Sequence, residues 1–179
     1  MNWNELENEV YAAAKEVFVN VQNAHPNEQF YAFALYTDSG AMTICPAANS
    51  VEGLTRELAN DETDPDGEEA AYYRWATSEW AYESWQADSF NDICTKLGDI
   101  PESEDFAHTQ AKVYEVMTNA LARLSKEGVF KPQSSGDAPV LFVTLTDDDE
   151  AEDVENRSAK VLNSPEVFEK FVNRFGREQ

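Results

Sequence analysis

The stretch that decides the fold is Phe30–Thr37, FYAFALYT, which carries no charged residue. Apolar side chains stand on both alternating faces of this segment, which predicts a β-strand covered on both sides by other elements. A second uncharged run, VLFVTLT at Val140–Thr146, is rich in β-branched and aromatic residues and predicts another buried strand. Together the two runs indicate a sheet at the centre of the molecule.

Turn signals and aromatic residues predict further strands beside the first. Residues 38–40, Asp-Ser-Gly, have the composition of a three-residue hairpin loop, so we expect 41–45 to return antiparallel. Pro46 would end this pairing because it has no N–H to donate. Residues 72–76 and 79–82 are rich in aromatic side chains and predict more strand material. The expected sheet is mostly antiparallel, with about four to five strands.

Helices are predicted where apolar residues recur at spacings of three and four. The clearest case is Leu6, Val10, Val17 and Val21 in the first helix. The expected helices span 5–22, 50–59, 88–97, 106–127 closing at Gly128, a segment after 147, and a last helix that Ser164 caps. This order of elements predicts an α+β fold, with helices packed on a central sheet, in one domain over residues 1–179.

The charge balance limits the classes of partner. Among 179 residues there are 35 acidic and 13 basic ones, a formal net charge of −22. The aromatic content of 12% is too high for a disordered acidic chain, so a packed core is expected. Direct binding to nucleic acid or to an anionic membrane is not expected, because both need basic residues to neutralise phosphate. A basic protein is the partner that this charge allows.

The sequence also predicts a location. The first residues, MNWNELENEV, have neither the basic nor the apolar region of a signal peptide, and no run is long enough to span a membrane. Cys45 and Cys94 lie outside any CxxC pattern, which favours two free thiols, with a single disulfide as the alternative. We therefore expect a cytoplasmic protein.

No motif for catalysis or for cofactor binding is present. His25 and His108 are isolated, and no Gly-rich phosphate loop occurs. Residues 62–73 place Gly67 at the sixth position of a calcium loop, but Tyr73 stands where a bidentate Glu belongs. We therefore predict no catalytic residue, no cofactor and no metal, and a protein that is not an enzyme.

Acidic residues gather in three segments, 61–69, 99–105 and 147–155. The last holds seven acids in nine residues and directly follows a predicted strand. One or two acids suffice to cap a helix and complement its dipole, whereas seven repel one another. A solvated helix start and a partner-facing anionic surface both remain open. The candidate partner-binding acids are Asp147, Asp148, Asp149, Glu150, Glu152 and Asp153.

An aromatic block lies at 72–85, with six Trp or Tyr residues in 14 positions. Such residues fill protein cores, and they are also enriched at interfaces. They could also wall a pocket, with Arg74 or Glu79 as polar contacts. The candidate binding residues here are Trp75, Glu79, Trp80 and Tyr82.

Three stretches resemble a bacterial family catalogued as domain of unknown function 4303. They are FYAFALYTDSGAMTICPAANS, YYRWATSEWAYES and VLFVTLTDDDEAEDVENRSAKVLNSPEVFEKF. The most specific pieces are Trp75–Trp80 and Val143–Glu150. The resemblance runs from the first helix to Phe171 and implies a small bacterial cytoplasmic domain with no established catalytic residues. Families of this kind often occur beside secreted toxins as candidate immunity proteins, so the resemblance favours that role.

The leading hypothesis is an acidic protein-binding domain, an immunity-type inhibitor that occludes a basic bacterial toxin. The first alternative is a small-ligand-binding or enzymatic domain with an aromatic-walled pocket near 72–85. The second is a housekeeping interaction domain or a homodimer.

Overall fold

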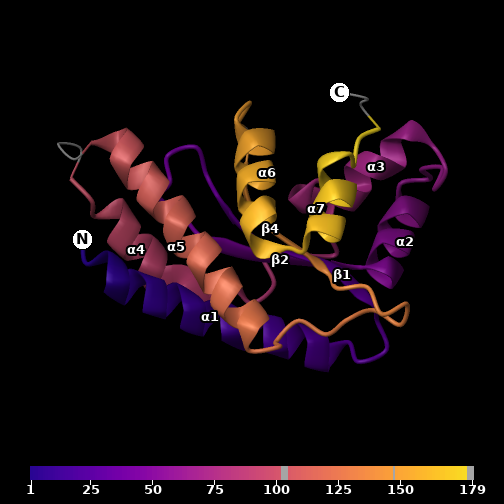
Figure 1. Ribbon diagram of the computed structural model, residues 1–179, viewed down its shortest axis with the longest axis horizontal. Coiled ribbons are helices and arrows are strands. Elements are labelled where there is room, and N and C mark those ends of the chain that lie inside the picture. The colour runs from indigo at the N-terminus through magenta and orange to yellow at the C-terminus, as the bar shows by residue number, and fades with distance from the viewer. Residues whose placement is uncertain (102–104, 147, 177–179) are drawn as a thin grey trace.

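A four-stranded sheet lies at the centre of the computed structural model, which describes residues 1–101, 105–146 and 148–176 (Figure 1). The strand order is β3-β2-β1-β4. The strands are β1 Phe30–Thr37, β2 Cys45–Ser50, β3 Tyr82–Glu83 and β4 Val140–Leu145. All of β1 is buried, because helices cover both of its faces. The α+β class and the two uncharged strands are thus as predicted.

The sheet is mixed, so the expectation of a mostly antiparallel sheet was wrong. β1 pairs antiparallel with β2 but parallel with β4, with Ala32 opposite Val140 and Thr37 opposite Leu145. Parallel neighbours need a long crossover rather than a hairpin. The chain between β2 and β4 contains several helices, and this length brings β4 back in the same direction as β1.

The hairpin between β1 and β2 is looser than predicted. The Asp38 carboxylate accepts hydrogen bonds from the Gly40 and Met42 amides, and the chain turns through 41–44 before β2 begins at Cys45. Pro46 lies inside β2 rather than ending it. The Pro46 carbonyl accepts a hydrogen bond from the Ser84 amide, on the side of β2 away from β1. The nitrogen of the same residue points to the same side, so the missing N–H of Pro46 costs no hydrogen bond to β1.

Of residues 72–76, predicted as a strand, the first four belong to helix α3, Glu68–Trp75, and Ala76 is its C-cap. The first four residues of α3, Glu-Glu-Ala-Ala, are good helix formers, and they outweigh the β-preference of the aromatic residues that follow. A 3₁₀ turn, Thr77–Glu79, comes next, and only Tyr82 and Glu83 form a strand. Strand content in this block is therefore much smaller than predicted.

The helices pack on both faces of the sheet (Figure 1). The larger core joins one face of the sheet to α1, α4 and α5, and the smaller core joins the other face to α2, α3 and α7. Helix α6 lies against the edge strand β4. The bounds are α1 Trp3–Ala24, α2 Val51–Asn60, α4 Asn91–Gly98, α5 Phe106–Lys126, α6 Ala151–Leu162 and α7 Pro165–Val172, with a 3₁₀ turn at Ala87–Phe90.

Side chains of α6 cover the open edge of β4. Ser158 Oγ lies 2.9 Å from the Val143 nitrogen, whose N–H donates to it. Asn163 accepts from the Leu141 N–H at 2.9 Å through Oδ1 and donates to the Leu141 carbonyl at 2.7 Å through Nδ2. Unpaired backbone groups on an edge strand invite pairing with another chain. Here Ser158 and Asn163 occupy those groups at two positions.

Two further sequence expectations concern cysteines and membranes. Cys45 and Cys94 are free thiols and both are half-buried. Within the described ranges, no helix combines the length and the apolar character needed to cross a bilayer.

Candidate functional site

A groove with a volume of about 440 Å³ opens beyond the carboxyl end of β4. We call it the carboxyl-end groove. It lies between the end of α3, the last residues of β4 and the start of α6. Its described lining residues are Tyr72, Trp75, Ala76, Thr77, Ser78, Thr144, Leu145, Thr146, Asp148, Asp149, Ala151, Glu152, Glu155 and Phe175.

The topology explains why a groove forms here. β1 and β4 are parallel and end at the same edge, where the chain leaves β4 and turns into α6. Crevices beyond the carboxyl ends of parallel strands are the usual ligand sites of open α/β sheets. The aromatic residues of α3 and the acidic run at the start of α6 meet at this edge, although Trp75 and Asp148 are 73 positions apart in sequence.

The predicted acids divide between two sides of α6. Asp148, Asp149 and Glu152 line the carboxyl-end groove. Glu150 and Asp153 line a separate, shallow hollow that also contains basic side chains, those of Arg157 and Lys160. Asp147 lies outside the described residues. Among the described residues, the acidic run therefore presents one face to a groove lined by no Lys or Arg and one face to a hollow with basic neighbours.

The start of α6 uses a single carboxylate of the acidic run. The Asp148 carboxylate accepts from the Glu150 amide at 2.8 Å and so shapes the turn that enters the helix. The N-cap residue itself, Glu150, makes no side-chain cap hydrogen bond. Capping thus accounts for Asp148 but not for Asp149, which is exposed.

A buried ion pair lies at the inner end of the groove. Glu155 Oε2 is 2.6 Å from Arg174 Nη2, and its Oε1 accepts from the Thr144 hydroxyl at 2.5 Å. The Arg174 side chain is fully buried and its Nη1 also donates to Asn156 Oδ1 at 2.8 Å. Burial raises the pKa of Glu155, although the hydrogen bond from Thr144 and the charge of Arg174 oppose the rise.

The aromatic block is partly at the groove and partly in the core. Trp75 lines the groove and makes an edge contact with Phe171, with ring centroids 5.2 Å apart. Two more rings of the lining are largely exposed, Tyr72 at 53% and Phe175 at 39%. Together they give the groove an aromatic wall in addition to its carboxylates.

The other predicted aromatic residues lie elsewhere. Trp80 and Tyr82 are both only 4% exposed, so their rings belong to the core and offer no surface to a partner. The Trp80 indole N–H donates to the Arg74 carbonyl at 3.0 Å. Glu79 is half-buried next to the groove and accepts from the Ser78 hydroxyl at 3.1 Å.

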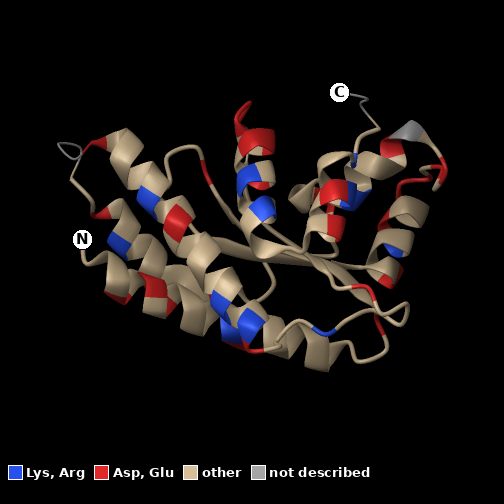
Figure 2. Cartoon of the chain, viewed as in Figure 1, with Lys and Arg blue, Asp and Glu red and all other residues tan. Residues whose placement is uncertain are grey.

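The three acidic segments lie along one side of the molecule. Figure 2 shows the described parts of 61–69, 99–105 and 147–155 on the upper side, at the right, left and centre. The charges at the start of α6 also act on Tyr114 of α5. Burial, and then the charges of Asp148 and Glu150, raise the pKa of Tyr114 to about 12. This side of the molecule is therefore strongly anionic.

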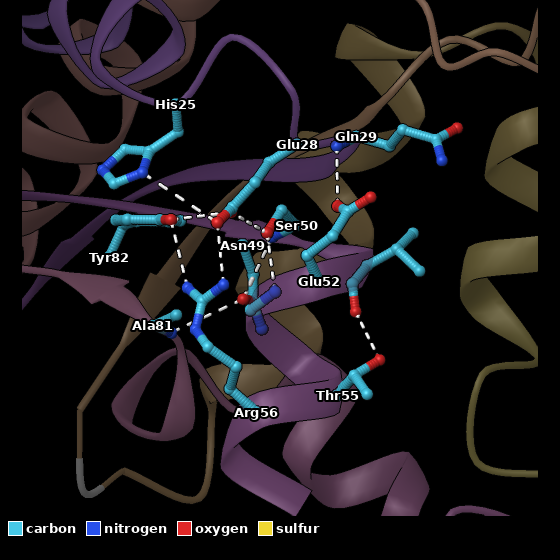
Figure 3. Close-up of polar contacts among 12 residues, drawn as sticks. His25, Glu28, Gln29, Asn49, Ser50, Glu52, Thr55, Arg56, Ala81 and Tyr82 are labelled. Atoms are coloured by element: carbon cyan, nitrogen blue, oxygen red, sulfur yellow. Dashed lines mark hydrogen bonds and ion pairs between the residues drawn. The ribbon is translucent and has the colours of Figure 1, made fainter.

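A second polar cluster, which sequence reasoning missed, lies at the opposite end of β1 (Figure 3). We call it the Glu28 cluster, formed by His25, Glu28, Ser50, Arg56 and Tyr82. Glu28 Oε2 accepts from the Ser50 hydroxyl at 2.5 Å and from the Tyr82 hydroxyl at 2.6 Å. Its Oε1 accepts from Arg56 Nη1 at 2.7 Å, and His25 Nδ1 lies 3.9 Å away.

The Glu28 cluster has the properties of a structural junction. Burial alone would raise the pKa of Glu28, but hydrogen bonds from Ser50, Tyr82 and Arg56 hold this pKa below its ordinary value. Burial and the bond to Glu28 raise the pKa of Tyr82 to about 12. At neutral pH the carboxylate stays charged and the phenol stays neutral, so the pair holds β1, α2 and β3 together and is not poised to transfer protons.

Sequence reasoning also missed Arg174 and Phe175. Both follow the last helix, and only the fold brings them to the end of β4. Glu155 was within the predicted acidic segment but was not among the candidate residues. As for metals, the described part of the chain contains no group of three or more His, Cys, Asp or Glu side chains arranged to hold an ion.

Comparison with known proteins identifies a family. The model of the family described as Domain of unknown function (DUF4303) matches residues 10–164, which includes most of the groove and the whole Glu28 cluster. No curated protein and no solved structure matches the chain.

Proposed function

This chain belongs to the domain of unknown function 4303 family, and we propose that it is an acidic protein-binding domain whose carboxyl-end groove receives a basic partner. More specifically, we propose an immunity-type inhibitor that occludes a basic toxin domain in the bacterial cytoplasm.

The observation that supports this proposal is the meeting of both candidate features in one groove. Asp148, Asp149 and Glu152 stand at the start of α6, and the exposed rings of Tyr72 and Phe175 lie in the same lining. Interfaces gain most of their binding energy from a few aromatic anchors, while charged groups set orientation and selectivity. The groove offers both kinds of group at one place.

The proposed mechanism is occlusion. The anionic side of the molecule would steer a cationic surface toward the groove and accelerate encounter, in a manner that salt weakens. A toxin that acts on nucleic acid needs a cationic active-site surface, and carboxylates placed over that surface would exclude the substrate phosphates. Families of this kind often occur beside secreted toxins as candidate immunity proteins, and this analogy favours the role.

Co-expression with the product of a neighbouring toxin gene tests the proposal. We expect the chain to co-purify with the toxin's basic C-terminal domain and to restore growth of cells that express it. The triple variant Asp148→Asn, Asp149→Asn, Glu152→Gln should associate at least tenfold more slowly at low salt, and its association should depend less on salt concentration.

A matched control removes the same charge away from the groove. The variant Glu16→Gln, Asp88→Asn, Asp92→Asn changes exposed residues of α1, the 3₁₀ turn Ala87–Phe90 and α4. It should associate nearly as fast as the unchanged chain. If both triple variants slow association equally, net charge rather than the groove is responsible. If the toxin does not co-purify, the inhibitor role is wrong.

The alternatives have less support in the geometry. A small-ligand pocket walled by Trp80 and Tyr82 is not available, because both rings are packed in the core. Of the three candidate aromatic residues Trp75, Trp80 and Tyr82, Trp75 alone lines the groove. A homodimer through the anionic side would bring like charges together, which costs free energy. Light scattering of the purified chain measures self-association directly and should give the mass of a monomer.

A further inference from the structure

We infer that the carboxyl-end groove is a receptor for one arginine side chain, which the basic partner inserts between the aromatic wall and the carboxylates. This inference rests on the proposed function, because the arginine would come from the partner protein.

The charge of the lining is unbalanced. Its described residues include four carboxylates, on Asp148, Asp149, Glu152 and Glu155, but no Lys or Arg. Arg174, which is not part of the lining, forms an ion pair with Glu155. The ion pairs among the described residues include none with Asp148 or Asp149. A cation of the partner would therefore meet the carboxylates of Asp148 and Asp149, which form no ion pair with the other described residues.

The aromatic rings select the kind of cation. Tyr72, Trp75 and Phe175 lie in the same lining, and the half-buried Trp75 ring is held in place by contacts with Phe171 and Tyr31. A guanidinium is planar and weakly hydrated, so it stacks on aromatic faces and binds carboxylates with two parallel hydrogen bonds. An ammonium is compact and strongly hydrated, and it gains less from such walls. The chemistry of the lining favours arginine over lysine.

The fold itself provides an example of this recognition mode. The Arg174 guanidinium is bound by the Glu155 carboxylate and lies 4.1 Å from the centroid of the Phe171 ring and 4.9 Å from that of Phe175. Phe175 also lines the groove. One wall residue of the proposed receptor therefore already contacts a guanidinium, and the carboxylate partner of that guanidinium is itself part of the lining.

NMR titration of the full chain with N-acetyl-arginine amide tests the inference. We expect saturable shifts of the Trp75 indole signal and of the amides of 144–146 and 148–152. The uncharged citrulline analogue should cause no saturable shift, because it keeps the shape but lacks the charge. The lysine analogue should bind at least threefold more weakly than the arginine analogue, because its compact, strongly hydrated ammonium gains less from the aromatic rings.

Two variants of equal charge give a matched comparison. Asp148→Asn with Asp149→Asn should weaken arginine binding at least tenfold. Glu150→Gln with Asp153→Asn alters the other side of the same helix start and should leave binding within about twofold. Tyr72→Ala, which removes an exposed ring without opening the core, should also weaken binding. Equal losses in the two double variants, or equal binding of arginine and citrulline, would overturn the inference.

The outcomes separate this inference from the function on which it rests. If the chain binds a toxin but not the arginine analogue, the function stands and the arginine receptor is wrong. If it binds the analogue but no basic protein, the groove is a site for a small guanidinium compound, and the protein-partner proposal fails.

Discussion

The two ends of the parallel pair β1–β4 use acidic residues in opposite ways. In the Glu28 cluster one carboxylate accepts hydrogen bonds from Ser50, Arg56 and Tyr82. In the carboxyl-end groove the described lining residues include four carboxylates and no Lys or Arg, and the ion pairs among the described residues include none with Asp148 or Asp149. The carboxylate of the Glu28 cluster has its partners within the chain, whereas those of Asp148 and Asp149 are the ones that the proposed cationic partner would contact.

This difference shows how stability and binding are divided within one small fold. A buried carboxylate with all of its hydrogen bonds made contributes to the stability of the junction around it. Carboxylates gathered without counter-charges repel one another and weaken the folded state slightly. Proteins retain such costs mainly where function requires them. The contrast is the reason why we propose the groove, and not the Glu28 cluster, as the binding site.

The largest expected effect comes from breaking the complete cluster. Glu28→Ala removes the acceptor of three hydrogen bonds and leaves the Ser50 and Tyr82 hydroxyls, both in buried residues, to find new partners. We expect the free energy of unfolding to fall by about 3 kcal/mol, measured by urea denaturation. Glu16→Ala on the exposed side of α1 is the control and should change it by less than about 0.5 kcal/mol. A loss below about 1 kcal/mol for Glu28→Ala would mean that the cluster is not a structural junction.

Lowering the pH should change the contributions of Glu28 and Glu155 to stability in opposite directions. The folded pKa of Glu28 is lowered, so its stabilising contribution is full above the ordinary pKa of 4.5 and is lost as pH falls through the folded value. The folded pKa of Glu155 is raised, so its contribution is full below 4.5 and is lost as pH rises through the folded value.

Two isosteric variants measure this difference. We expect the stability advantage of the unchanged chain over Glu28→Gln to shrink as pH is lowered from 7 to about 3.5. Over the same range the unchanged chain should gain stability relative to Glu155→Gln. Urea denaturation at several pH values gives both slopes. Slopes of the same sign would show that the two carboxylates do not differ in the way the structure indicates.

The smallest expected effect comes from neutralising the groove. Asp148→Asn with Asp149→Asn should change the free energy of unfolding by less than about 0.5 kcal/mol, because Asn can still accept the hydrogen bond from the Glu150 amide. Because the variant removes repulsion between carboxylates, any change should be a gain in the free energy of unfolding, and this gain should be smaller at high salt concentration. A large loss of stability would mean that these carboxylates serve the fold rather than a partner.

The central strands and the long helices could be predicted because their signals are local. FYAFALYT and VLFVTLT carry enough apolar surface to identify buried strands, and α5 follows the expected apolar stripe. The parallel pairing of β4 with β1 could not be predicted, because strand direction depends on how the intervening helices pack. α3 was missed because aromatic residues occur in strands and helices alike, and tertiary packing decides between them.

The site could be predicted only in its parts. Residues 147–155 and the aromatic block were identified from composition, but their meeting at one groove depends on the topology of the sheet. Trp75 and Trp80 are only five positions apart, yet one lines the groove and the other lies in the core. Arg174 carried no signal of its own, since a single basic residue after the last helix resembles an ordinary surface residue.

The cover that Ser158 and Asn163 place over β4 limits how this protein can assemble. A strand from another molecule cannot add to that side of the sheet without displacing those side chains, and on the other side β3 offers a margin of only two residues. The uncharged central strands are thus protected at β4 from edge-to-edge pairing with a second molecule. A partner that bound at the proposed groove would be recognised through side chains rather than by adding a strand to β4.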